Sequence, residues 1–355
     1  MQTCLGSKDV DMTDARKGIV TGGTWCIDRN KMIDFWPSED AAVEIHLLDI
    51  QGGGSGCNLA IDMKKLDPTL AVATIGLVGD DEDGRFLIAQ ADRYGIDRRQ
   101  LAITRDAPTQ FTDAFGSRRS GRRTHLYYQG TARLLTPDFF DFTDVTARIL
   151  HLGLPGVHGI MDAPWRGEAN GWAAVLMKAR AAGLKTNLEL VSVAPERIAA
   201  LARPCLPHLD FLIVNDTEIG AIAGEATVED GVTAVNACIR AARRVLGEGA
   251  MRLVAVHFPT GAVVVTREGT VIESPSVDVP KAEVVSANGA GDAFAAGLLY
   301  GLHEGWSIED ALTLAHAAAA ASLRSLSTTT TVESWRDCLA LAARWGWREG
   351  LSNTG

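Results

Sequence analysis

"SANGAGDAFAAGLLYGL", residues 286–302, joins a glycine-rich turn to an alanine-rich apolar run. Gly289 and Gly291 flank Ala290, and Asp292 follows directly. Because glycine lacks a Cβ atom, the backbone N–H groups of this turn can converge on one point. A helix that begins here directs its unpaired N–H groups and its positive dipole end at the same point. The arrangement suits an anion, and Asp292 could take a proton from a hydroxyl beside it. Taken alone, the motif is more typical of a plain turn and helix cap, because short motifs often match by chance.

The chain around this motif alternates between strand and helix patterns. Apolar runs of strand length occupy residues 147–153, 184–190, 209–215 and 252–258, and helical patterns occupy 170–183 and 232–247. This alternation predicts an α/β fold, with a mainly parallel sheet covered by helices on both faces. We expect one domain over residues 18–350, preceded by a disordered tail over residues 1–17.

Two segments depart from the alternation and predict a small β-strand lid. Residues 31–51 and 109–133 are strand-like and partly polar, which suits a small sheet projecting from the main body. By contrast, residues 18–28, "GIVTGGTWCID", predict a single buried strand that ends in polar residues.

Composition limits the classes of partner. The formal net charge is −10, whereas proteins that neutralise nucleic-acid phosphates are usually basic. No stretch approaches eighteen uninterrupted apolar residues, and the first residues are unlike a signal peptide. Six scattered cysteines form no CxxC pair, which is typical of reduced thiols. We therefore predict a cytoplasmic protein that acts on a small molecule, with neither nucleic acid nor membrane as partner.

Four further motifs stand in a fixed order before residues 286–302: "GGTWCID" at 22–28, "GGGSGCNLA" at 52–60, "ATIGLVGDDEDGRF" at 73–86 and "IVNDTEIGAIAG" at 213–224. Together with "NGAGDAF" they resemble the signatures of the ribokinase-like (PfkB) family of carbohydrate and nucleoside kinases. The resemblance spans nearly the whole chain. It implies a ribokinase-like fold, a kinase that uses ATP and Mg²⁺, and lids that often pair in homodimers.

The resemblance assigns roles residue by residue. Asp292 matches the base that deprotonates the acceptor hydroxyl, and Gly289, Ala290 and Gly291 match the anion hole for the transferring phosphoryl group. The acceptor site is matched by Asp28, Gly53, Gly54 and Asn58. Asn215 and Glu218 match the N-x-x-E pair that organises Mg²⁺ and its waters around the ATP phosphates. Taken alone, "NDTE" also fits an ordinary capping box.

The sequence departs from the family pattern at two places. Ser286 and Ala287 replace the first two residues of the DTxGAGD signature, whose aspartate helps to form a monovalent-cation site. The resemblance therefore does not extend to activation by a monovalent cation. Phe258 and Pro259 stand where the family has a glycine-containing loop, so the nucleotide contacts of that region are not carried over.

The acceptor stays open at this point. Arg118, Arg119, Arg122 and Arg123 fit either a phosphorylated sugar or a solvated hairpin turn. The favoured activity is phosphorylation of a hydroxyl of a small sugar or sugar-like substrate. One alternative is a nucleoside kinase, with Phe35, Trp36 and Phe111 as a slot for the base. The other is a catalytically silent sugar- or nucleotide-binding protein.

Overall fold

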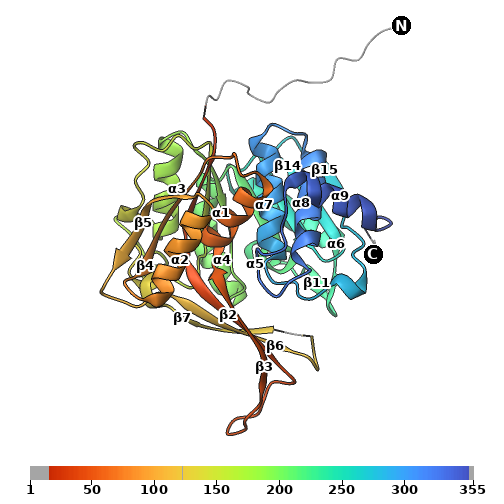
Figure 1. Ribbon diagram of the computed structural model, residues 1–355. Coiled ribbons are helices and arrows are strands. Elements are labelled where there is room, and N and C mark those ends of the chain that lie inside the picture. The colour runs from red at the N-terminus through yellow and green to blue at the C-terminus, as the bar shows by residue number, and fades with distance from the viewer. Residues whose placement is uncertain (1–15, 122, 352–355) are drawn as a thin grey trace.

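A nine-stranded sheet runs through the body of the computed structural model, which describes residues 16–121 and 123–351 (Figure 1). The strand order is β15-β14-β13-β10-β9-β8-β1-β4-β5. The strands from β13 to β5 in this order are parallel, and β14 and β15 are antiparallel additions. Their bounds are β1 Ile19–Gly23, β4 Val72–Gly79, β5 Asp97–Thr104, β8 Ile149–Gly153, β9 Lys185–Leu188, β10 Phe211–Asn215, β13 Leu253–Phe258, β14 Gly261–Thr266 and β15 Val271–Pro275. The predicted mainly parallel sheet is confirmed.

Helices bury both faces of this sheet. One face is covered by α1 Ser55–Leu66, α2 Glu82–Arg93, α7 Ala290–His303, α8 Ile308–Ser322 and α9 Trp335–Trp345. The other is covered by α3 Gly171–Ala181, α4 Pro195–Ala202, α5 Asp216–Ala223 and α6 Val235–Glu248. Successive strand residues point to opposite faces, so Ile19 joins the first core and Val20 the second. The continuous apolar runs of the sequence follow from this double burial.

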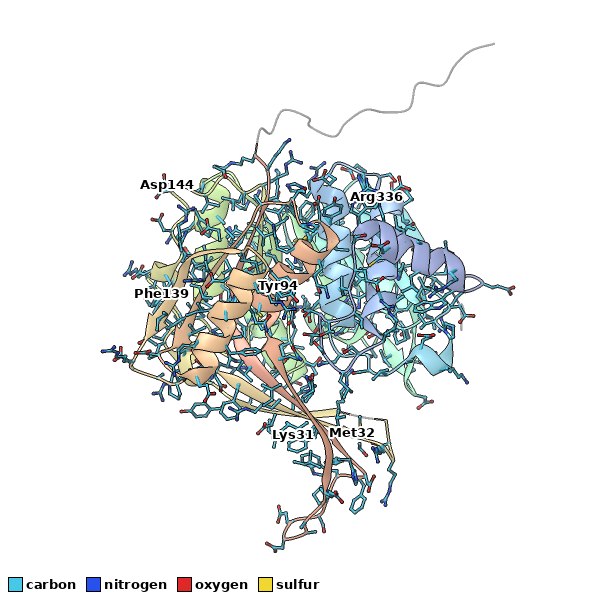
Figure 2. The ribbon with its side chains drawn as sticks, in the orientation of Figure 1. Lys31, Met32, Tyr94, Phe139, Asp144 and Arg336 are labelled. Atoms are coloured by element: carbon cyan, nitrogen blue, oxygen red, sulfur yellow. The ribbon has the colours of Figure 1, made fainter. Side chains whose placement is uncertain are left out.

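A separate four-stranded sheet forms the predicted lid. Its order is β3-β2-β6-β7, with bounds β2 Cys26–Ile33, β3 Ile45–Gly53, β6 Phe111–Ser117 and β7 Arg123–Tyr128. The two central strands, β2 and β6, are parallel to each other, and both edge pairings are antiparallel. The sheet projects below the body in Figure 1, and Figure 2 labels Lys31 and Met32 on it. The lid prediction is confirmed.

Shorter elements complete the described chain. They are the strand pair β11 Val228–Glu229 and β12 Val232–Thr233, and 3₁₀ turns at Gly130–Arg133, Pro137–Phe139, Arg203–His208 and Lys281–Glu283. Among the described residues, no helix combines the length and apolarity that crossing a membrane requires.

The prediction of one strand over residues 18–28 is wrong. Gly23 has a φ of +107°, and a Cβ there would lie 1.7 Å from the carbonyl oxygen of Gly153. The chain turns at this close approach, with Thr24 N–H donating to Gly153 O at 2.9 Å. β1 therefore ends at Gly23, and Cys26 begins the lid strand β2. Asp28 consequently lies on the lid and not at the end of a body strand.

The predicted tail over residues 1–17 falls mostly outside the described residues, which begin at Arg16. The Arg16 guanidinium donates to the carbonyl oxygens of Val145, at 2.8 Å, and Ala147, at 3.2 Å. The cysteines that the structure describes are all free and buried, and Cys4 lies outside the described residues.

Candidate active site

The glycine turn at the start of α7 places Asp292 in the first helical turn. Gly289 is the N-cap, with a left-handed φ of +76°, and a Cβ there would lie 2.4 Å from the Thr328 carbonyl oxygen. Only glycine fits this position without strain. The Asp292 Oδ2 atom accepts a 3.0 Å hydrogen bond from Asn58 Nδ2 on α1. The predicted base and one predicted acceptor residue, 234 positions apart, therefore meet directly.

The remaining predicted acceptor residues lie beside this pair. Gly53 ends β3 and Gly54 caps α1 with a φ of +86°. A Cβ on Gly53 would lie 2.2 Å from the Asp28 carboxyl group, so the missing side chain makes room for that carboxyl. Burial, and then the charge of Asp292, raise the pKa of Asp28 to about 7. The structure thus brings the lid carboxyl close enough to Asp292 to feel its charge.

Asn215 and Glu218 form the capping box of α5. Asn215 Oδ1 accepts from the Glu218 N–H at 2.8 Å, and the Asn215 N–H donates to Glu218 Oε2 at 3.0 Å. The capping box that "NDTE" predicts is therefore present in the structure. Burial raises the pKa of Glu218 to about 7. Asn215 also ends β10 at the carboxyl edge of the sheet, where ligands of open α/β sheets bind.

Two residues that the sequence analysis did not single out complete the cluster. Glu189 follows β9, and its carboxyl lies against that of Asp292, close enough for the two to share a hydrogen bond. His151 on β8 lies 2.7 Å from Glu189, from Nε2 to Oε2, with its side chain fully buried. A histidine inside the apolar run 147–153 and a glutamate at the end of the run 184–190 were the available signals. Their meeting depends on the pairing of β8 with β9.

A cavity of about 470 Å³ opens beside the start of α7. Its wall near the glycine turn includes Asn215, Ala290 and Gly291, and its apolar wall is formed by Phe258, Pro259, Val277, Val279, Phe294, Ala319 and Leu323. A flat apolar base and a polar phosphate chain need this combination of surfaces. Phe258 and Pro259, which break the family pattern, thus line the cavity as apolar wall.

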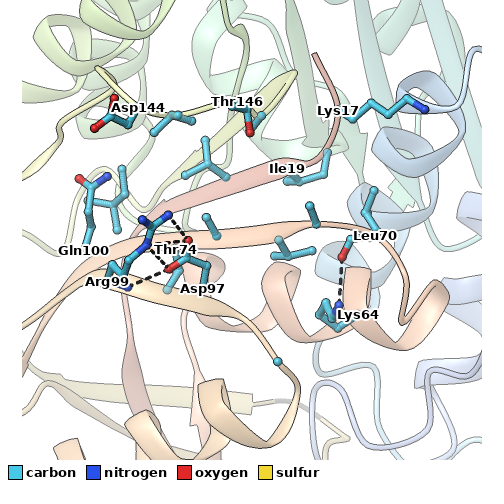
Figure 3. Close-up of a pocket in the computed structure, with 18 of the residues that line it drawn as sticks. Lys17, Ile19, Lys64, Leu70, Thr74, Asp97, Arg99, Gln100, Asp144 and Thr146 are labelled. Carbon is cyan, nitrogen blue, oxygen red and sulfur yellow. Dashed lines mark hydrogen bonds and ion pairs between the residues drawn. The ribbon is translucent and has the colours of Figure 1, made fainter. Parts of the chain in front are cut away.

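A second cavity, of about 540 Å³, opens at the opposite ends of the strands (Figure 3). Ile19 and Val72, the first residues of β1 and β4, line it, and none of the predicted site residues does. Its ionic groups include the Arg99–Asp97 pair, and Lys64 Nζ donates to the Leu70 carbonyl oxygen (Figure 3). We place the active site at the carboxyl edge of the sheet, where Asp292 lies.

The lid contacts the loop before the glycine turn through side chains of β2 and β7. Asn288 Nδ2 donates to Asn30 Oδ1 at 3.2 Å, and Arg123 Nη1 donates to Ser286 Oγ at 3.4 Å. The other described lid arginines lie elsewhere: Arg118 pairs with Asp34 at 3.6 Å, and Arg119 stacks on Phe35. Arg122 lies outside the described residues.

The predicted aromatic slot for a nucleoside base is dispersed among different contacts. Phe35 stacks under Arg119, Trp36 meets Phe115 edge-on, and Phe111 stacks on Tyr128. Each of the three rings therefore already has a partner within the lid.

A parallel α/β body, a lid, and a carboxylate at a glycine-lined helix start beside a cavity define a class of small-molecule kinases. The family model for the pfkB family carbohydrate kinases matches residues 24–335. The chain therefore belongs to the pfkB family of carbohydrate kinases, and it is an ATP-dependent sugar kinase.

Known proteins with similar sequence or structure include enzymes for different acceptors. A 5-dehydro-2-deoxygluconokinase of Shouchella clausii is 26% identical over 310 residues, covering 85% of this chain and 88% of that protein. An adenosine kinase of Schizosaccharomyces pombe is 22% identical over 274 residues, which cover 74% of this chain and 77% of that protein. The structure of Arabidopsis thaliana ribokinase complexed with ribose and ATP superposes with a TM-score of 0.74 at 20% identity. The superposition covers 92% of this chain and 99% of that one. That structural likeness shows the shared fold.

Proposed function

We propose that this kinase transfers the γ-phosphoryl group of ATP to a hydroxyl of a small sugar acid or comparable anionic sugar, with Asp292 as the base. The main support for this transfer step is the position of the Asp292 carboxyl. Asn58 holds it in the first turn of α7, beside Gly289–Gly291. The hydroxyl oxygen attacks phosphorus, its proton passes to Asp292, and the bond to the leaving ADP oxygen breaks. The backbone N–H groups at the helix start stabilise the transferring phosphoryl.

The cavity of about 470 Å³ is the proposed adenosine site, because its polar end adjoins the glycine turn. Mg²⁺ would be held by Asn215 and Glu218 through water and by the ATP phosphates, where it would neutralise phosphate charge. The donor set fits this indirect mode. Within residues 16–121 and 123–351, no group of three or more His, Cys, Asp or Glu side chains could hold a metal directly.

Arg123 supports an anionic acceptor. It lies exposed on lid strand β7 and reaches to Ser286, three residues before the glycine turn, where its Nη1 donates to Ser286 Oγ at 3.4 Å. The surrounding carboxyls Asp28, Glu189 and Asp292 would repel an anion, whereas an arginine fork binds a carboxylate or phosphate well. The 5-dehydro-2-deoxygluconokinases among the relatives are named for a substrate that is an acid.

We expect Arg123→Gln to raise the KM for an anionic sugar about 10- to 100-fold, because a charge-assisted hydrogen bond contributes about 1.5–3 kcal/mol. The KM for ATP should stay unchanged. ADP release measured with a panel of sugar acids, sugar phosphates, neutral sugars and nucleosides tests this. Arg118→Gln, at the Asp34 pair of the hairpin, is the matched control. Preference for a neutral sugar, or an equal effect of both variants, would contradict the proposed acceptor. Preference for a nucleoside would favour the nucleoside-kinase alternative.

We further propose that two copies of the chain associate through their lids. The lid exposes large apolar side chains, namely Trp36, Ile45, Leu47, Leu48, Ile50, Leu126, Tyr127 and Tyr128, each more than 40% accessible. It projects from its own body (Figure 1), and its edge strands β3 and β7 have no further partner within the sheet. Exposed apolar patches and open strand edges mark association surfaces.

Leu48→Glu is expected to convert a dimer into a monomer, because it places a charge in the shared apolar surface. Sedimentation equilibrium of both proteins at micromolar concentration measures the mass. Lys64→Glu, on a helix of the body, controls for the change in charge. A wild-type protein that sediments as a monomer at every concentration would contradict the lid dimer.

A further inference from the structure

Among the described residues, Glu189 is a carboxyl that contacts the proposed base and to which the family resemblance assigns no role. We propose that Glu189 is a positioning residue that shares a proton with Asp292 and thereby sets the pH at which Asp292 can act as a base. The proposal rests on the assignment of Asp292 as the base under the proposed function. The shared proton itself is a property of the protein without substrate, so it can be tested in the absence of turnover.

The hydrogen bonds behind Glu189 determine which carboxyl carries the charge. Asn187 Nδ2 donates to His151 Nδ1 at 3.0 Å, which leaves the histidine proton on Nε2. That Nε2–H donates to Glu189 Oε2 at 2.7 Å. Burial lowers the pKa of His151 to about 4, so this imidazole is a neutral, permanent donor at neutral pH. Burial raises the pKa of Glu189 to about 7, and the donation from His151 opposes that rise by stabilising the ionised form.

The hydrogen bonds of Asp292 favour the opposite assignment of the proton. Asn58 Nδ2 donates to its Oδ2 atom at 3.0 Å, and the carboxyl of Glu189 lies against that of Asp292. Two carboxylates in contact cannot both be ionised without strong repulsion, so one proton lies between them. With Glu189 stabilised by His151, that proton belongs mainly to Asp292. Burial and the charge of Glu189 accordingly raise the pKa of Asp292 well above its usual range.

Other titratable groups face the pair from each neighbouring element. They are Asp28 on β2, Cys57 and Asp62 on α1, His151 on β8, Glu218 on α5 and, beside Gly291, His257 on β13. Asp62, Glu218 and Asp28 act on the pair through their charge, whereas Glu189 contacts Asp292 directly. The electrostatic effect of these groups on Asp292 is still present when Glu189 alone is substituted. The change in the Asp292 midpoint in such a variant therefore reports the contact with Glu189.

The proton balance follows from this arrangement. Before transfer, Asp292 must lose its proton to water. During transfer, the acceptor oxygen bonds to phosphorus as its O–H bond breaks and an O–H bond forms on Asp292, while the electron pair of the broken P–O bond leaves with ADP. Glu189 can then accept that proton in its hydrogen bond before release to water. Removing the charge of Glu189 lowers the pKa of Asp292, so the base becomes ionised at lower pH.

The test follows the carboxyl groups directly. In ligand-free protein carrying ¹³C-labelled Asp and Glu carboxyls, Glu189→Gln should lower the titration midpoint of Asp292 by more than one pH unit. Asp292→Asn should lower the midpoint of Glu189 in turn, because coupling between two titrating sites is reciprocal. Glu189→Asp, which keeps a carboxyl, should leave Asp292 nearer its wild-type midpoint. Asp62→Asn removes a buried carboxyl that does not contact Asp292, and it should shift Asp292 by a smaller amount.

The pH profile of kcat then links the shared proton to turnover. The acid limb of Glu189→Gln should move to lower pH by the same amount as the Asp292 midpoint. An Asp292 midpoint that stays or rises in Glu189→Gln would overturn the shared proton, whether or not the enzyme turns over. A lowered midpoint with an unmoved acid limb would instead show that Asp292 is not the base, which contradicts the proposed function. Thermal unfolding of each variant identifies any that has lost its fold. If Glu189→Gln is lost, the Glu189 midpoint in Asp292→Asn carries the comparison, and a midpoint that stays or rises there would overturn the shared proton.

Discussion

Asp292→Asn is expected to lower kcat about 10³-fold, because a positioned general base contributes about 10²–10⁴-fold. The amide keeps the size of the carboxyl and the contact to Asn58, so the fold and the KM for ATP should stay unchanged. Steady-state ADP release at saturating ATP and acceptor measures kcat, and binding of ATP to the variant is measured separately.

Asp310→Asn is the matched control for this loss. Asp310 is also a first-turn carboxylate of a helix, but it lies in α8 and accepts from Ser307 Oγ at 2.8 Å. Its substitution should leave kcat unchanged. A fall of less than tenfold in Asp292→Asn would contradict the role of Asp292 as the base.

Gly289→Ala should impair both stability and turnover. At a φ of +76° an alanine is strained, and its Cβ would lie 2.4 Å from the Thr328 carbonyl oxygen. We expect a destabilisation of about 1–3 kcal/mol from the backbone conformation alone. Because the glycine turn must move, its N–H groups leave the phosphoryl position, and kcat should fall about 10²–10³-fold. Thermal unfolding and ADP release measure the two effects.

Gly305→Ala separates strain from loss of the anion hole. Gly305 has a φ of +75°, nearly that of Gly289, but no atom lies within 4 Å of a Cβ built there. This variant should lose some stability and keep its kcat. Equal loss of activity in both variants would mean that backbone strain, and not the geometry of the glycine turn, accounts for the effect.

Local chemistry explains what the sequence could predict. Gly289 and Asp292 act within one helical turn, so their spacing along the chain fixes their geometry, and α7 begins where the glycines predict. The alternating strands and helices likewise predicted the parallel body, because double burial leaves continuous apolar runs. The capping box of α5 follows from the spacing of Asn215 and Glu218 for the same reason.

Contacts between distant strands explain what the sequence could not predict. Glu189 and His151 meet because β8 pairs with β9. In the sequence of either strand alone, such a polar residue indicates only the end of the strand or a single buried polar side chain. The break between β1 and β2 depends on the approach of Gly23 to Gly153, 130 positions further along the chain. Arg123 is one of four similar arginines, and only the folded lid distinguishes it by directing it at Ser286.

Transfer of radiolabel from [γ-³²P]ATP distinguishes a phosphotransferase from a protein that only binds ATP and a sugar. The protein is incubated with labelled Mg·ATP and the preferred acceptor, and the label is counted after ATP, acceptor and inorganic phosphate have been separated. A kinase with Asp292 as the base should place label on an acceptor hydroxyl, and Asp292→Asn should abolish this transfer. Label that appears only as inorganic phosphate, or that remains in tightly bound ATP with every acceptor tested, would show that the protein does not phosphorylate these acceptors.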